Sequence, residues 1–131
     1  MPSVFSRIVA RELPSHGVYE DEAVYAFLDI NPVAAGHTMV IPKVEVDEFF
    51  ALDPLILAHL MKVAQPIAAA IKRVTGVARI GAVVAGFDVP HAHLHLIPVN
   101  SLADLDFRRA RAAKQEELRE MADNIRRALA E

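Results

Sequence analysis

The 131-residue chain contains no cysteine and no tryptophan, and only 6% of its residues are aromatic. Without cysteine it has no disulfide, no thiol nucleophile and no cysteine-ligated zinc site. That composition is compatible with the reducing cytoplasm, where we expect the protein to lie. The chain also lacks a basic run and has a formal net charge of −3. We therefore do not expect the phosphate-neutralising surface of a nucleic-acid-binding protein.

Long apolar runs are missing as well. The N-terminal stretch "MPSVFSRIVARELP" interrupts its apolar residues with Arg7, Arg11 and Glu12, unlike the continuous apolar region of a secretory signal. No uninterrupted apolar run approaches the ~20 residues that cross a bilayer. We therefore expect no association with a membrane.

What the chain has in quantity is core-forming residues, because 53% of it is hydrophobic. Its length and composition predict one domain over residues 1–131. Apolar periodicity predicts the order helix, strand, strand, strand, helix, strand, strand, helix. Tight hairpins in that order favour an α+β fold, an antiparallel sheet of about five strands with helices packed on one face. The predicted helices cover about residues 3–12, 54–75 and 107–131, and the predicted strands about 17–21, 23–30, 37–43, 78–86 and 91–99.

The most unusual stretch is "HAHLHLIPV", which places His91, His93 and His95 at every second position. Successive side chains of a strand point to opposite faces, so the three rings should share one face and the intervening apolar residues the other. Neighbouring imidazoles then sit about 6–7 Å apart along the strand. Such a row is not ordinary core, because each ring carries polar nitrogens.

Three interpretations of this row stay open from the residues alone. The rings are structural and satisfied by local hydrogen bonds, or they bind a metal ion, or one neutral imidazole attacks phosphorus while its neighbours orient it. Rings spaced this way do not converge unaided at ~2.0–2.1 Å from one zinc ion. His37 begins another predicted strand after Gly36. It favours the third interpretation if strand pairing brings it beside the row.

These residues resemble the histidine triad family. "HAHLHLI" is similar to the family motif His-φ-His-φ-His-φ-φ, in which φ is apolar, and "FLDINPVAAGHTMVIPK" is similar to the family's other block. The resemblance covers roughly residues 4–98. It implies a homodimer whose two sheets join, and hydrolysis or transfer at the α-phosphate of nucleotide conjugates, without a cofactor.

The resemblance also implies a role for each histidine. His93 would be the nucleophile that forms a covalent nucleotidyl-histidine. His95 would hydrogen-bond the α-phosphate oxygens or the leaving group. His91 would orient the site, and His37 would relay a hydrogen bond to the triad.

The remaining predicted site residues would bind a purine nucleotide, such as an AMP or GMP conjugate. Asp29 falls where the family grips the ribose hydroxyls, although a turn residue at a strand end is an equally simple interpretation. Ile30 would form part of the base pocket. Phe87 and Asp88 lie in the segment that leads into the triad, "AGFDVPH", at positions that help to hold phosphate in the family.

Several positions depart from the family pattern. Phe87 replaces a frequent Gln and Asp88 a Ser or Thr, so a nucleotide-binding module with little turnover is the alternative function. An ionised Asp88 would also raise the pKa of nearby histidines. Ser3, Ser6 and Glu45 stand where some relatives carry Cys-x-x-Cys and a histidine. We therefore expect no structural zinc and no metal in the site, and a metal-dependent hydrolase is a third possibility.

Overall fold

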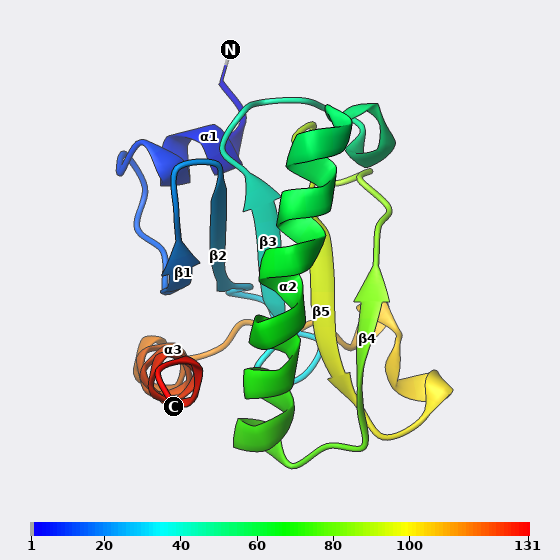
Figure 1. The fold of residues 1–131 in the computed structure, drawn as a ribbon. Coiled ribbons are helices and arrows are strands. Elements are labelled where there is room, and N and C mark those ends of the chain that lie inside the picture. The colour runs from blue at the N-terminus through cyan, green and yellow to red at the C-terminus, as the bar shows by residue number, and fades with distance from the viewer. Residues whose placement is uncertain (1) are drawn as a thin grey trace.

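The computed structural model describes residues 2–131, which form a five-stranded antiparallel sheet with three helices (Figure 1). The predicted order of elements and the α+β fold are confirmed. Three short 3₁₀ turns, Phe49–Ala51, Leu102–Asp104 and Phe107–Arg109, complete the chain. The helices are α1 (Val4–Val9), α2 (Pro54–Thr75) and α3 (Gln115–Leu129), and the strands are β1 (Gly17–Glu20), β2 (Val24–Leu28), β3 (Thr38–Pro42), β4 (Arg79–Val83) and β5 (Leu94–Val99).

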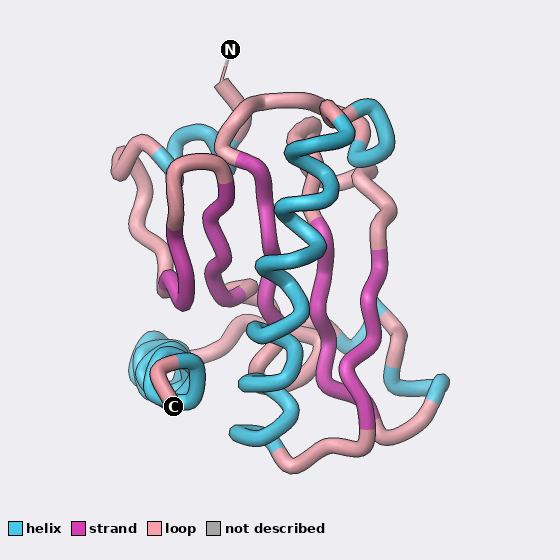
Figure 2. Tube along the Cα trace, viewed as in Figure 1, coloured by secondary structure: helices cyan, strands magenta, loops and turns pink. Residues whose placement is uncertain are grey.

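The order of the strands across the sheet is β1-β2-β3-β5-β4, with every neighbouring pair antiparallel (Figure 2). The pairing of β3 with β5 matters most for function, because these strands are far apart in the sequence. Their register places Met39 opposite His95 and Thr38 opposite Leu96. The start of β3, which follows His37, is thereby brought beside the histidine row.

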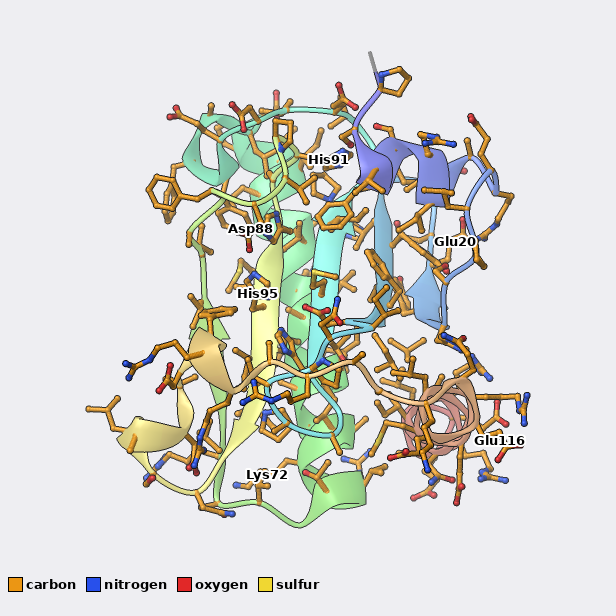
Figure 3. All side chains as sticks on the ribbon, turned by 180° about the vertical axis from the view of Figure 1, so that it is seen from behind. Glu20, Lys72, Asp88, His91, His95 and Glu116 are labelled. Atoms are coloured by element: carbon orange, nitrogen blue, oxygen red, sulfur yellow. The ribbon has the colours of Figure 1, made fainter. Side chains whose placement is uncertain are left out.

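Alternate residues of the strands build two apolar layers. Val24, Ala26 and Leu28 of β2 join the main core, which contains residues of α2 and α3. Tyr25 and Phe27 point the other way and form a smaller cluster with Phe5, Met39 and Ile41. The expectation that all helices lie on one face is therefore wrong for α1, since its Phe5 packs against the second face. Figures 1 and 3 show α2 and α1 on opposite sides of the sheet.

The boundaries of α2 follow from its flanking residues. The Asp53 carboxylate accepts a hydrogen bond from the backbone N–H of Leu55 at 2.8 Å, and Pro54 occupies the first turn. At the other end Gly76 has φ 73°, the left-handed conformation that favours glycine at a helix C-terminus. Pro66 lies inside the helix without ending it.

By length and composition alone, α2 is apolar enough to cross a membrane. In this fold its apolar side packs against the sheet, where Leu60, Ile67 and Ile71 have no exposed surface. One side of α2 thus belongs to the core, while Leu55 and Met61 on the same helix are exposed.

The last helix is shorter than predicted. It begins at Gln115 instead of about residue 107. The preceding segment is held extended, because the backbone N–H of Ala113 donates to the Ile30 carbonyl at 3.0 Å and that of Arg111 to the Pro32 carbonyl at 3.3 Å. These bonds use backbone donors that a helix would need. They also draw the segment across the back of the sheet, below His95 in Figure 3.

The strand that carries the triad also starts later than predicted, at Leu94 instead of His91. The backbone N–H of His91 donates to Val89 at 2.8 Å and that of Ala92 to Val46 at 2.7 Å. Neither bond belongs to the sheet. Two of the three histidines therefore lie in the loop that enters β5.

Candidate active site

The three histidines lie on the side of the sheet opposite α2, where Figure 3 labels His91 and His95. The apolar residues between them, Ala92 and Leu94, belong to the main core, so the predicted division of the row into two faces holds. The ring centroids of His93 and His95 are 4.9 Å apart, closer than the strand spacing suggested. All three rings are buried, and His93 is only 2% exposed.

Hydrogen bonds to carbonyl oxygens determine the tautomers of His91 and His93. His93 Nδ1 lies 2.7 Å from the His91 carbonyl, which can only accept, so Nδ1 carries the proton. In the neutral ring His93 Nε2 then has a free lone pair. His91 Nε2 donates to the Pro42 carbonyl at 2.8 Å, so its Nδ1 accepts from the Ser3 hydroxyl at 2.8 Å. His91 thus presents its own carbonyl in a fixed place and orients His93.

A second chain of hydrogen bonds determines the tautomers of His37 and His95. The backbone N–H of Val33 donates to His37 Nδ1 at 3.0 Å, which leaves the proton of the neutral ring on Nε2. His37 Nε2 then donates to His95 Nδ1 at 2.9 Å. Because His95 Nδ1 accepts, His95 Nε2 carries a proton in the neutral ring. The site therefore presents one acceptor, on His93, and one donor, on His95.

Asp29 makes the turn contact that one interpretation predicted, and its role toward ribose stays a prediction. Its Oδ1 accepts from the backbone N–H of Asn31 at 2.9 Å, which is a turn contact. Its Oδ2 lies 3.7 Å from His37 Nε2, which places the other oxygen beside the histidine cluster. Burial raises the pKa of this carboxyl above its ordinary value.

The pKa values of the buried imidazoles reflect loss of solvent. Burial lowers the pKa of His37 and that of His95 to about 4, and it lowers the pKa of His91 as well. Asp29 and Asp88 raise the pKa of His95, but less than burial lowers it. Asp88 therefore raises the pKa of His95 as expected, but burial outweighs this effect, and His95 is neutral at pH 7.

Folding stability should depend on pH through His37 and His95. Their pKa is about 4 in the folded state and ~6.5 when unfolded, so the unfolded chain binds more protons between those values. Acidification from pH 7 towards 4 should therefore reduce the free energy of unfolding, by about 3 kcal/mol if the hydrogen-bonded pair is counted once. Urea unfolding at several pH values measures this free energy. A His37→Gln/His95→Gln variant should lose less of its free energy of unfolding between pH 7 and 4. Equal dependence of this free energy on pH in both proteins would contradict the assignment to His37 and His95.

A cavity of about 290 Å³ opens in front of the triad, between α1 and strands β2 and β3. His93 and His95 line one end, with Asp29 and Asp88, and apolar side chains including Phe5 line the rest. Ile30 stands at its rim, 53% exposed. A larger cavity, about 480 Å³, lies between the β2–β3 loop and α3, but it touches only Asp29 and His37 of the predicted site. The smaller one is therefore the candidate nucleoside cavity.

Phe87 lies apart from the other predicted nucleotide-binding residues. Its side chain is 96% exposed and lines a different cavity, of about 510 Å³, which His93 also borders. Asp88, its neighbour in the chain, lines the nucleoside cavity instead. The loop before the triad thus turns these two side chains to different sides of His93.

Two groups of residues in the site could be considered metal ligands by their position. Asp29, His37 and His95 have ligand atoms within 4.8 Å of one another. His37 Nε2 and His95 Nδ1 are already hydrogen-bonded to each other, so an ion between them would have to break that bond. The absence of a metal at this place therefore stays a prediction.

The second group contains Ser3, Ser6, Glu45 and His91. Ser6 Oγ donates to Glu45 Oε1 at 2.7 Å, and Ser3 joins Glu45 to His91 through its backbone N–H and its hydroxyl. Neutral hydroxyls are not among the ligands that bind zinc in structural sites. The donor set therefore does not fit a structural zinc ion and instead forms a closed hydrogen-bond network.

Three contacts of the site have no signal in the motif. Ser3 hydrogen-bonds His91 from 88 positions away. The Phe5 ring meets His93 edge to face, with centroids 5.1 Å apart, and the Phe107 ring meets His95 at 5.0 Å. These aromatic contacts help to keep water from the imidazoles, yet sequence spacing cannot reveal them.

Comparison with known proteins gives consistent results. Residues 10–102 match the HIT domain family. The adenosine 5'-monophosphoramidase HNT1 of Saccharomyces cerevisiae is 36% identical over 96 residues, which cover 72% of this chain and 61% of the yeast protein. Among solved structures, a Hit-like protein of Bartonella henselae superposes with a TM-score of 0.85 at 34% identity, covering 96% of this chain and 95% of that one. A Zn-bound histidine triad family protein of Mycobacterium smegmatis superposes with a TM-score of 0.83 at 31% identity, covering 97% and 92%.

Proposed function

This chain belongs to the HIT domain family, and on that basis we propose that it hydrolyses nucleotide conjugates at the α-phosphate through a covalent nucleotidyl-histidine. The substrate class is a nucleoside phosphoramidate or a related conjugate of AMP or GMP. The observation that carries the proposal is the pair of tautomers, a free lone pair on His93 Nε2 beside an N–H on His95 Nε2.

The reaction follows from these two atoms. His93 Nε2 attacks the α-phosphorus, so that a nitrogen–phosphorus bond to the enzyme forms as the bond to the leaving group breaks. His95 Nε2–H faces the same space and donates a hydrogen bond to the leaving group or to a phosphate oxygen. Water then attacks the nucleotidyl-histidine and frees His93. One water is consumed overall, with its hydroxyl on phosphorus and its other proton on the leaving nitrogen.

The nucleoside cavity supports a purine nucleoside. Its walls are mainly apolar, as Phe27, Met39 and Val89 illustrate, which suits the faces of a base. Asp29 presents a carboxylate at the same cavity and can accept hydrogen bonds from ribose hydroxyls.

The direct test is the mass of the intact protein after a brief reaction with adenosine 5'-phosphoramidate and an acid-free quench. We expect the 14.4 kDa chain to gain one adenylyl group, located on His93 by peptide mapping, with turnover unchanged by chelator. Steady turnover without an adduct, and with a His93→Ala variant still active, would refute the covalent route.

The same assay separates two other functions. Asp88 brings a carboxylate to the cavity that would hold the phosphate, and Phe87 turns away from it, which favours a nucleotide-binding module with little turnover. Nucleotide binding without any turnover would support that function. The Asp29, His37 and His95 cluster favours a metal-dependent hydrolase. Loss of activity on chelation, restored by zinc, would support that one.

We also propose a homodimer. β4 lies at the edge of the sheet, and within residues 2–131 no strand pairs with its outer side. Such an edge leaves backbone N–H and C=O groups free to pair with a second copy. Light scattering at micromolar concentration should give twice the 14.4 kDa mass of the chain. A single species of 14.4 kDa over the whole concentration range would contradict the dimer.

A further inference from the structure

Two of the triad histidines are held by contacts outside the sheet. His91 and His93 precede Leu94, the first residue of β5, so strand pairing does not fix their positions. A nucleophile in an irregular loop needs other support, because a displacement of about 1 Å can cost roughly a hundredfold in rate. The ring of His93 is oriented by the His91 carbonyl, which lies 2.7 Å from His93 Nδ1. The position of His91 therefore decides where the attacking Nε2 points.

The buried ring of His91 is hydrogen-bonded at both nitrogens. Its Nε2 donates to the Pro42 carbonyl at 2.8 Å, and its Nδ1 accepts from the Ser3 hydroxyl at 2.8 Å. A carbonyl can only accept, whereas a hydroxyl rotates and can either donate or accept. The group that holds the Ser3 hydroxyl in its donating direction therefore also determines how His91 is held.

Glu45 holds the Ser3 hydroxyl in this direction. The carboxylate Oε1 of Glu45 accepts from the backbone N–H of Ser3 and, at 2.7 Å, from the Ser6 hydroxyl. Ser6 Oγ also lies 3.4 Å from His91 Nδ1, but Glu45 uses its single hydroxyl proton. Ser3 Oγ accepts from the backbone N–H of Ser6 at 3.0 Å, and its own proton is left for His91. The four residues therefore form one chain of hydrogen bonds with a single direction.

This chain of hydrogen bonds joins three distant segments. Ser3 caps the N-terminus of α1, Glu45 lies in the linker between β3 and α2, and His91 lies in the β4–β5 loop. Figure 3 shows His91 beside α1. The linker holds the triad loop at a second point, because the Val46 carbonyl accepts from the backbone N–H of Ala92 at 2.7 Å. Glu45 is exposed and Ser3 is buried, so an exposed carboxylate is connected to the buried triad through one hydroxyl.

We propose that Glu45 and Ser3 are positioning residues for the nucleophile: they hold the ring of His91 in place, and the carbonyl of His91 in turn directs His93 at the α-phosphorus. The inference rests on the proposed function, because it needs attack by His93. Neither Glu45 nor Ser3 lines the nucleoside cavity, so they are not placed to contact a nucleoside there. Their loss should therefore lower the rate of attack and leave nucleotide binding nearly unchanged.

The rate of adduct formation on His93 tests this role, measured by intact mass during a single turnover of adenosine 5'-phosphoramidate. Ser3→Ala removes the donor to His91 Nδ1. Glu45→Ala frees the Ser6 proton to compete for the same nitrogen. We expect each variant to slow adduct formation by about 10- to 100-fold, the range for a misplaced reacting group. Ser3→Thr keeps the hydroxyl and Glu45→Gln keeps a carbonyl acceptor, so both should restore most of the rate.

A double variant tests whether Glu45 acts through Ser3. If it does, Ser3→Ala/Glu45→Ala should form the adduct about as slowly as Ser3→Ala alone, because effects within one hydrogen-bond network are not additive. Losses that multiply in the double variant would overturn the route through Ser3. The matched control is Glu22→Ala, which removes the same charge from the exposed turn between β1 and β2. It should keep the wild-type rate.

A merely structural role of the network would give a different result. Val4, Phe5 and Ile8 of α1 line the nucleoside cavity, so a loosened helix would weaken the binding of AMP along with the rate. We expect the affinity for AMP, measured by calorimetric titration, to change little in Ser3→Ala and Glu45→Ala. The Nδ1 proton of His93 should exchange with water faster in both variants than in the wild type, as nuclear magnetic resonance can measure, because its carbonyl acceptor is less firmly held.

The outcomes separate the inference from the proposed function. Wild-type rates of adduct formation on His93 in both alanine variants would overturn the inference and leave the proposed function in place. Equal losses of rate and of AMP affinity would also overturn it, since the network would then only support α1. Because Glu45 is exposed, Glu45→Ala should fold and decide the question even if Ser3→Ala does not fold. If the wild type forms no adduct, the proposed function is wrong and the inference falls with it.

Discussion

Replacing His93 with alanine should lower turnover by a factor of about 10⁴ or more, the scale of nucleophile removal, while the affinity for AMP changes little. In the proposed reaction, Nε2 of His93 is the atom that attacks phosphorus. The proposed contacts with base and ribose lie in the nucleoside cavity, on Asp29 and the apolar walls, and the substitution leaves these residues in place. Steady-state kinetics with adenosine 5'-phosphoramidate, together with calorimetric titration of AMP, measures both quantities.

A matched variant is available in the same chain. His16 lines neither of the two cavities that His93 borders, and it hydrogen-bonds Gln115 at 2.8 Å, so His16→Ala removes an imidazole without touching the triad. It should keep near-normal turnover. A His93→Ala protein that remains active within tenfold would mean that another group attacks. Equal losses of turnover and of AMP affinity would make His93 a binding residue.

The fold was largely predictable because its signals are local. The continuous run of apolar, strand-forming residues in "VYAFL" is a local signal, and so are the residues Asp53, Pro54 and Gly76 that bound α2. The exceptions depend on distant partners. The backbone of residues 110–114 hydrogen-bonds to the β2–β3 loop, so α3 begins later than predicted. Helix α1 packs on the second face of the sheet because Phe5 contacts Phe27 there.

The sequence indicated which histidines would lie together, but it did not indicate the hydrogen bonds between them. The spacing of the triad and the block before β3 identified His37 and the three later histidines as neighbours. The tautomers depend on the carbonyls of His91 and Pro42 and on the amide of Val33, and these are set by the three-dimensional path of the chain. No pattern in the sequence indicates which nitrogen of a ring carries the proton.

The loop before the triad shows a different limit. Phe87 and Asp88 were both assigned to nucleotide binding because they are adjacent in "AGFDVPH". Adjacent side chains point in different directions in an irregular loop as they do in a strand. Only Asp88 lines the nucleoside cavity, and Phe87 borders the cavity of about 510 Å³ that His93 also lines. The departure from the family pattern at Asp88 therefore adds a carboxylate to the nucleoside cavity, whereas the departure at Phe87 leaves that cavity unchanged.

His95 offers the second large effect. Because His37 donates to Nδ1 of His95, the proton of the neutral His95 ring lies on Nε2. Burial lowers the pKa of this ring to about 4, so it is neutral at pH 7. A neutral donor of this kind helps most when the leaving atom needs a proton. We therefore expect His95→Asn to reduce kcat/KM by about 10²–10³ for an alkyl amine leaving group, within the range of general acid catalysis.

The same variant should lose little kcat/KM, about tenfold or less, when the leaving group departs as a stable anion. The p-nitrophenyl ester of AMP is such a substrate, because p-nitrophenolate needs no proton to leave. Comparing the two substrates in both proteins therefore assigns the His95 donor. If the loss is equal for both, His95 donates to a phosphate oxygen, whose charge is similar in the two reactions. A His37→Phe variant, which removes the donor to His95 Nδ1 and frees the tautomer, should show the same dependence on the leaving group in weaker form. If His37→Phe lowers kcat/KM equally for both substrates, His37 does not act through the His95 donor.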